Sequence, residues 1–113
     1  MPITNQEVLD YGLLGRLYED DYFPDHVLDK GVAILTRLCE RIQDDPPADL
    51  EALYALTQAA VEEFNNLEAE FDAAGSEIET VAREEIGEAF TIIAQAYGYP
   101  DADDEELIAG RNW

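Results

Sequence analysis

The sequence has few basic residues and few of the residue types on which many catalytic and metal sites depend. Its 27 acidic residues face only six basic ones, which gives a net charge of −21. That charge opposes binding to nucleic acid or to an anionic membrane and favours basic surfaces. Cys39 is the single cysteine, so the chain has no disulfide framework of its own and no cysteine-based zinc site.

Long apolar runs are absent as well. The longest one, residues 31–35, is far too short to span a bilayer. The first seven residues are polar, unlike a signal peptide. We therefore expect a cytoplasmic protein. Its 113 residues, 47% of them hydrophobic, predict one acidic helical domain over residues 1–113 with a core of its own.

A strong helical pattern is present, organised around a turn at residues 73–79. Gly75 can adopt the left-handed conformation that ends a helix. Ser76 and Glu79 have the spacing of a capping box, which starts the next helix. The flanking segments, about 49–74 and about 77–97, carry apolar residues at helical spacing. We expect two antiparallel helices joined by this turn.

Two further helices are expected before this pair. Thr4 and Glu7 form another capping-box pattern, so the first helix begins near Asn5. Gly12 and Gly15 within it indicate either close packing against a neighbouring helix, which we favour, or a local irregularity.

The second helix covers about 26–43, after Pro24 and with Asp25 as its N-cap. After Gly98, Asp101 can cap a short last helix, with Leu107, Ile108 and Trp113 as apolar anchors. The sequence thus predicts an all-α fold, an antiparallel helical bundle of four main helices plus a short C-terminal helix.

Catalytic motifs are not evident. The sequence has no Gly-rich phosphate loop and no convincing Ser–His–Asp set. A carboxylate metal site in a bundle uses histidines at helical spacing from glutamates, and none lies so placed. The acids that could be considered are Glu62, Glu63, Glu84, Glu85 and Glu88. We interpret them as a solvated face and Cys39 as a small core residue, and we expect no catalytic residue, metal or cofactor.

One segment has the composition of an interaction surface. Aromatic residues surrounded by charge are typical of interface hot spots, and residues 18–26 combine both around a proline. The candidate partner-binding residues are Tyr18, Asp20, Asp21, Tyr22, Phe23, Asp25 and His26. The alternative is a connecting loop whose aromatics lie in the core while its acids face water, with His26 as a surface or capping residue.

The segments YFPD (22–25), GSEIETVARE (75–84) and YGYPDAD (97–103), with Trp113, resemble a family of small acidic all-helical bacterial proteins of unknown function. The resemblance covers the whole chain. It implies no activity and no site residues.

The sequence favours a non-enzymatic module that binds a basic protein partner, in the manner of an immunity protein or an inhibitor. One alternative is a small enzyme or a ligand- or metal-binding bundle that uses carboxylates of the third and fourth helices. Another is that the acidity reflects adaptation to a salty habitat. We expect neither a nucleic acid nor a membrane as partner, and the sequence predicts no oligomeric state.

Overall fold

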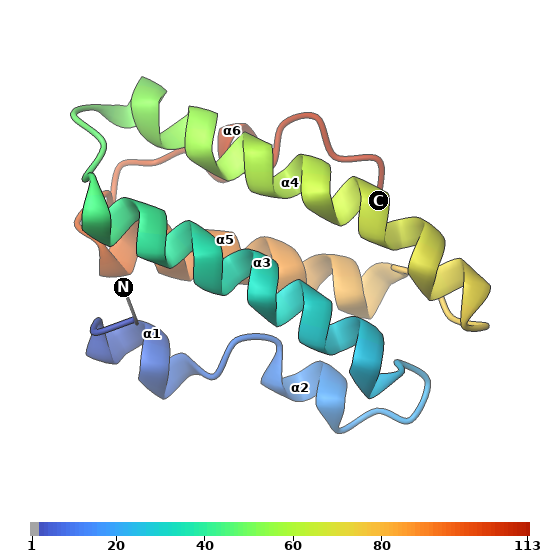
Figure 1. Cartoon of the computed structure of the whole chain (residues 1–113). Coiled ribbons are helices and arrows are strands. Elements are labelled where there is room, and N and C mark those ends of the chain that lie inside the picture. The colour runs from blue at the N-terminus through green and yellow to red at the C-terminus, as the bar shows by residue number, and fades with distance from the viewer. Residues whose placement is uncertain (1–2) are drawn as a thin grey trace.

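The computed structural model describes residues 3–113, and every regular element within them is a helix (Figure 1). In chain order these are α1 (Gln6–Tyr11), α2 (Gly15–Tyr18), α3 (Asp25–Asp44), α4 (Leu50–Ala73), α5 (Thr80–Ala96) and α6 (Asp104–Leu107). Helices α3 and α4 lie side by side and antiparallel, α1 and α2 follow the other side of α3, and α5 lies behind. Helix α6 packs against α4 and α5. The all-α bundle is confirmed, with the first of its four helices divided into α1 and α2.

The core forms where the apolar faces of the long helices meet. Phe64 of α4 and Phe90 of α5 pack edge to face, with ring centroids 6.0 Å apart. Trp113 packs against Phe64 in the same manner at 6.2 Å. Trp113 is buried together with Leu107 and Ile108, so the predicted apolar anchors of the C-terminal segment are confirmed.

A left-handed glycine ends both α4 and α5, and the prediction made for Gly75 is confirmed. Gly75 is left-handed at φ +81°, and the N–H of Ser76 donates to the carbonyl of Phe71 at 2.8 Å. Gly98 repeats this arrangement at φ +92°, with a 2.8 Å bond from the N–H of Tyr99 to the carbonyl of Ala94. In both turns the bond satisfies a carbonyl that the end of the helix leaves without an intrahelical partner.

The predicted capping box between Ser76 and Glu79 was wrong. Helix α5 begins three residues later than expected, at Thr80, and Glu79 is its N-cap. The Glu79 carboxylate accepts from the N–H of Val81 at 3.2 Å. The Ser76 hydroxyl is instead buried and has no hydrogen-bond partner among the described residues, because Ser76 completes the turn that ends α4 and lies too far from the first turn of α5.

Three other predicted capping residues were also wrong. The side chain of Asn5 caps α1, not that of Thr4, by accepting from the N–H groups of Glu7 and Val8 at 3.0 and 3.3 Å. Asp25 is the first residue of α3, not its cap. Asp103 caps α6, where Asp101 was expected. In α1 and α6 the capping side chain lies two and three residues before the amides it satisfies, the usual geometry of an N-cap.

The predicted first helix is broken by two left-handed residues. Gly12 ends α1 at φ +73°, and Leu14 has φ +58°, a conformation that costs free energy for a residue with a Cβ. The interpretation of Gly12 and Gly15 as close-packing positions was wrong, because a Cβ built on either would meet no atom within 4 Å. The irregularity allows Leu14 and Leu17 both to be buried.

Candidate functional site

Residues 19–24 connect α2 to α3 in a turn organised by Asp20. Its carboxylate accepts from the N–H of Tyr22 at 2.9 Å, and its carbonyl accepts from the N–H of Phe23 at 3.1 Å. Aspartate commonly stabilises a turn by bonding the backbone two residues further on. Pro24, extended at φ −70° and ψ 131°, then leads directly into α3. The connection is therefore held by its own hydrogen bonds.

The two adjacent aromatics of this turn have opposite exposure. Phe23 is only 2% exposed and packs edge to face on Phe71 of α4, with ring centroids 6.4 Å apart. Tyr22 is 44% exposed and packs edge to face on Phe23 at 5.0 Å. Phe23 is thus an anchor in the core, and it supports a tyrosine that is presented to solvent.

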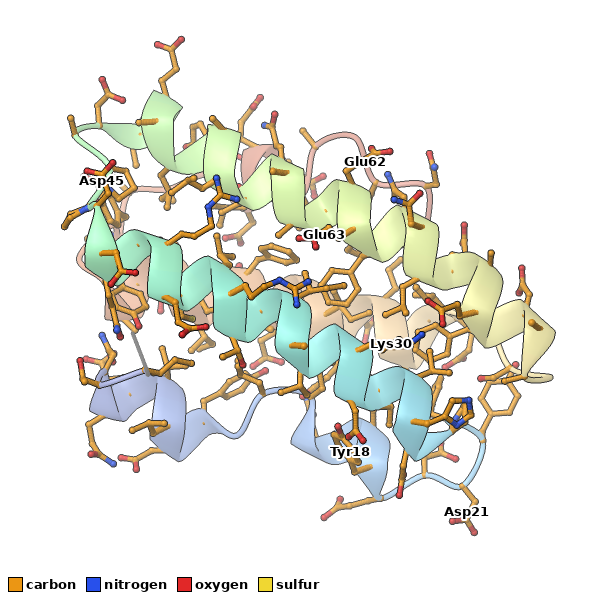
Figure 2. The ribbon with its side chains drawn as sticks, viewed as in Figure 1. Tyr18, Asp21, Lys30, Asp45, Glu62 and Glu63 are labelled. Atoms are coloured by element: carbon orange, nitrogen blue, oxygen red, sulfur yellow. The ribbon has the colours of Figure 1, made fainter. Side chains whose placement is uncertain are left out.

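Tyr18, the last residue of α2, contacts α3. Its ring is partly buried, and its hydroxyl donates to Asp29 Oδ1 of α3 at 2.6 Å. Burial, and then the hydrogen bond to Asp29, raises the pKa of Tyr18. Figure 2 shows Tyr18 on α2, beside α3. This residue therefore ties α2 to α3, and Asp29, which sequence analysis did not single out, is its partner.

The carboxylates of the segment are exposed. They belong to Glu19, Asp20, Asp21 and Asp25. Asp21 points away from the helices (Figure 2). None of the four lies within 4.0 Å of a cationic group in residues 3–113, where the ion pairs involve Arg16, Lys30 and Arg37. The segment therefore surrounds the exposed Tyr22 with carboxylates that form no ion pair with a basic side chain of residues 3–113.

His26 is exposed in the first turn of α3. It lines a hollow of about 440 Å³ between the start of α3 and the end of α4, together with Pro24, Glu70 and Ala73. The predicted partner-binding residues therefore divide into two groups. Asp20, Asp21, Tyr22, Asp25 and His26 are exposed, whereas Phe23 is buried and Tyr18 is partly buried.

The acids interpreted as one solvated face lie in different surroundings. Glu85 is 3% exposed, so that interpretation was wrong for this residue. The Nε of Arg16, from α2, donates to Glu85 Oε2 at 2.8 Å, and its Nη2 donates to Glu88 Oε2 at 2.9 Å. The prediction failed because the burial of Glu85 depends on tertiary structure. Its cationic partner lies 69 residues earlier in the chain, and no local sequence signal indicates that pairing.

A tyrosine from α1 completes this ionic cluster. The Tyr11 hydroxyl is buried and makes no hydrogen bond of normal geometry within residues 3–113. Burial, followed by the charges of Glu85 and Glu88, raises the pKa of Tyr11 to about 12. The cluster therefore keeps the Tyr11 phenol neutral to a higher pH than an exposed tyrosine.

The other acids considered for a metal site are separated. Glu63 accepts from Arg37 of α3 at 2.8 Å, while Glu62, its neighbour, points away from α3 (Figure 2). In residues 3–113 no three His, Cys, Asp or Glu side chains are placed to hold a metal ion together. Cys39 is buried, and this burial is the main reason why the pKa of its thiol is raised to about 11. In the same part of the chain, no helix has both the length and the apolar composition needed to cross a membrane.

The comparisons with known proteins identify a family whose function is unknown. Searches of curated proteins and of solved structures give no match. A family model described as a family of unknown function, DUF5713, matches residues 7–113. The predicted resemblance to a family of unknown function is thereby confirmed. The chain belongs to the DUF5713 family.

Proposed function

We propose that this protein is a non-enzymatic binding module that engages a basic protein partner through residues 18–26. The observation that carries the proposal is the exposed Tyr22 ring, seated on the buried Phe23 and surrounded by carboxylates without cationic partners. A rigid aromatic in the centre of a charged rim is the usual arrangement of an interface hot spot. An immunity protein or inhibitor of a basic toxin or nuclease is the class of function that fits.

The segment is held by contacts within the chain, which supports a binding role. The turn is fixed by Asp20, and Phe23 is held against Phe71. Ordering flexible residues on association costs free energy, about 0.5–1.5 kcal/mol for each immobilised side chain. A segment that is ordered beforehand avoids part of that cost. The dense negative charge would accelerate encounter with a basic surface and make the association rate sensitive to salt, and it would repel nucleic acid.

Affinity capture from native lysate at low salt tests this proposal. The protein is immobilised, bound proteins are eluted with rising salt, and the eluted basic protein is purified for kinetic measurement. We expect the double variant Asp20→Asn/Asp21→Asn to slow association several-fold at low salt. Asparagine retains the oxygen that accepts from Tyr22, so the turn should persist. Tyr22→Ala should instead raise the dissociation rate.

The matched control is Glu105→Gln/Glu106→Gln, which removes two charges from α6, away from the segment. Equal slowing by the control and the Asp20/Asp21 variant would mean that net charge alone drives association, and would overturn the assignment of the surface. Failure to retain any protein at low salt would contradict the binding function, as expected if the acidity serves only solvation in a salty habitat.

A further inference from the structure

A hollow of about 440 Å³ lies between α5 and the C-terminal segment and contains two of the six basic side chains. Arg83 and Thr91 line it from α5, and Arg111 lines it after α6. In a chain with 27 acidic residues, most basic side chains should find a carboxylate nearby, and Arg16, Lys30 and Arg37 do so. The grouping of two arginines in one hollow is therefore unexpected.

Neither arginine of the hollow is paired. No carboxylate in residues 3–113 lies within 4.0 Å of the guanidinium of Arg83 or of Arg111. The Nε of Arg83 is also buried and lacks a hydrogen-bond partner among these residues. A buried donor without an acceptor destabilises the folded state, and more strongly when it is charged. An acceptor that occupies the hollow would remove that penalty.

Three carboxylates line the hollow beside the two arginines, those of Glu84, Glu88 and Asp104. Glu88 accepts from Arg16 at 2.9 Å, and Asp104 accepts from the Thr91 hydroxyl at 3.0 Å. Glu84 is exposed. The more distant acids of the molecule act weakly here, because charges more than ~8 Å apart in water are screened at physiological ionic strength. The guanidinium groups of Arg83 and Arg111, which have no carboxylate of residues 3–113 within 4.0 Å, are the charged donors that remain available to an entering acceptor.

We propose that this hollow binds the oxyanion group, a carboxylate or a phosphate, of a small molecule, with Arg83 and Arg111 as its ligands. The planar guanidinium presents a fork of N–H donors that matches both oxyanions. The volume lies within the range of about 300–1,000 Å³ that is usual for small-molecule sites, so the ligand can be larger than the anion alone. The site does not depend on residues 18–26, and either proposal can fail without the other.

Trp113 provides a built-in reporter of binding. It is the only tryptophan, and the guanidinium carbon of Arg111 lies 5.6 Å from the centre of its ring. An anion that engages Arg111 will change the charge beside the indole and therefore its fluorescence. The probes are inorganic phosphate in one arm and succinate in the other. Each is titrated into the full chain at constant ionic strength, with chloride as the balancing anion.

We expect a saturable fluorescence change with at least one probe, and the responding arm identifies the oxyanion. Arg83→Gln, which leaves Arg111 and Trp113 in place, should weaken binding at least tenfold. Arg41→Gln, an arginine near the end of α3 that lines a different hollow, should leave it unchanged. The Hε resonance of Arg83, followed by NMR in the wild-type chain, should shift with the same saturation curve and does not depend on any variant folding.

Two results would overturn the assignment. One is the absence, in both arms, of any saturable response beyond that of chloride. The other is a folded Arg83→Gln variant, verified by circular dichroism, that binds the probe as tightly as the wild type.

Discussion

Leu14, in the break between α1 and α2, packs against the bare Cα of Gly31 in α3. A Cβ built on Gly31 would lie 3.0 Å from Leu14 Cδ1 and 3.3 Å from Phe64 Cε1. Both distances are shorter than ordinary van der Waals contact, so a Cβ at position 31 would force Leu14 and Phe64 to shift. The contact joins the left-handed Leu14 to the centre of the bundle and shows how the core stabilises a strained backbone.

Gly31→Ala should therefore destabilise the protein by about 1 kcal/mol, since overpacking, about 1–3 kcal/mol, exceeds the gain of roughly 1 kcal/mol from replacing a helical glycine. The matched control is Gly87→Ala in α5, where a Cβ would meet only Ile108 Cδ1 at 4.0 Å. That variant should be stabilised by up to about 1 kcal/mol. Urea denaturation measures both. Equal stabilisation by the two substitutions would show that the side chains of Leu14 and Phe64 can move away from the new Cβ without a cost in free energy.

Ser76→Ala should raise the free energy of unfolding, by about 1 kcal/mol, because it removes a buried hydroxyl without a hydrogen-bond partner. A capping serine would behave in the opposite way and lose about 1 kcal/mol on the same substitution. Gly75→Val, one residue earlier, should cost about 1 kcal/mol or more, because a β-branched residue resists φ +81°. Thermal and urea unfolding distinguish these outcomes by their sign.

Arg16→Gln should destabilise the protein more than Glu88→Gln does. The first substitution leaves the carboxylate of Glu85, whose side chain is 4% exposed, without its cation, whereas the Glu88 side chain is 48% exposed. The double variant Arg16→Gln/Glu85→Gln should recover part of the loss, because it removes the buried charge as well. Additive losses in this double-mutant cycle would mean that the two side chains are not coupled.

Alkaline pH should weaken the folded state through Tyr11. Its pKa is raised from 10.0 to about 12, so between these values the unfolded chain loses a proton that the folded chain retains. The free energy of unfolding therefore falls with pH in that window, and the contribution is fully present below pH 10. Tyr11→Phe should make this fall less steep in urea titrations at pH 9, 10 and 11. A fall of the same steepness would place the effect on other groups, such as Tyr18, whose pKa is also raised.

The long helices could be predicted from the sequence because their signals are local. Apolar residues recur at helical spacing through α3, α4 and α5, and Gly75 and Gly98 end α4 and α5 by a backbone conformation that glycine adopts readily. Helix starts were less predictable. Several polar residues precede α1, α5 and α6, and the one that caps depends on where the chain enters the helix, as for Ser76 and Glu79.

The break in the first helix and the surroundings of the acids were not accessible from the sequence. The left-handed Leu14 is stabilised by tertiary contacts, including that with Gly31, and the cation that covers Glu85 comes from the opposite end of the chain. Within the candidate surface, composition predicted a proline-containing loop, and the structure has one between α2 and α3. Composition could not separate the presented Tyr22 from the buried Phe23, because that difference depends on packing against Phe71 of α4.

Helix α1 also constrains the order in which the chain can complete its structure during synthesis. The Nδ2 of Asn5 donates to the carbonyl of Ala96 at 2.7 Å, across 91 positions of the sequence. Helices α3 and α4, which are consecutive and antiparallel, can pair as soon as both have left the ribosome. Helix α1 emerges earlier, yet its contacts are mainly with α5, so it must wait for α5 before it can dock, whereas α2 can already contact α3. The part of the chain that is made first is therefore among the last to reach its native contacts.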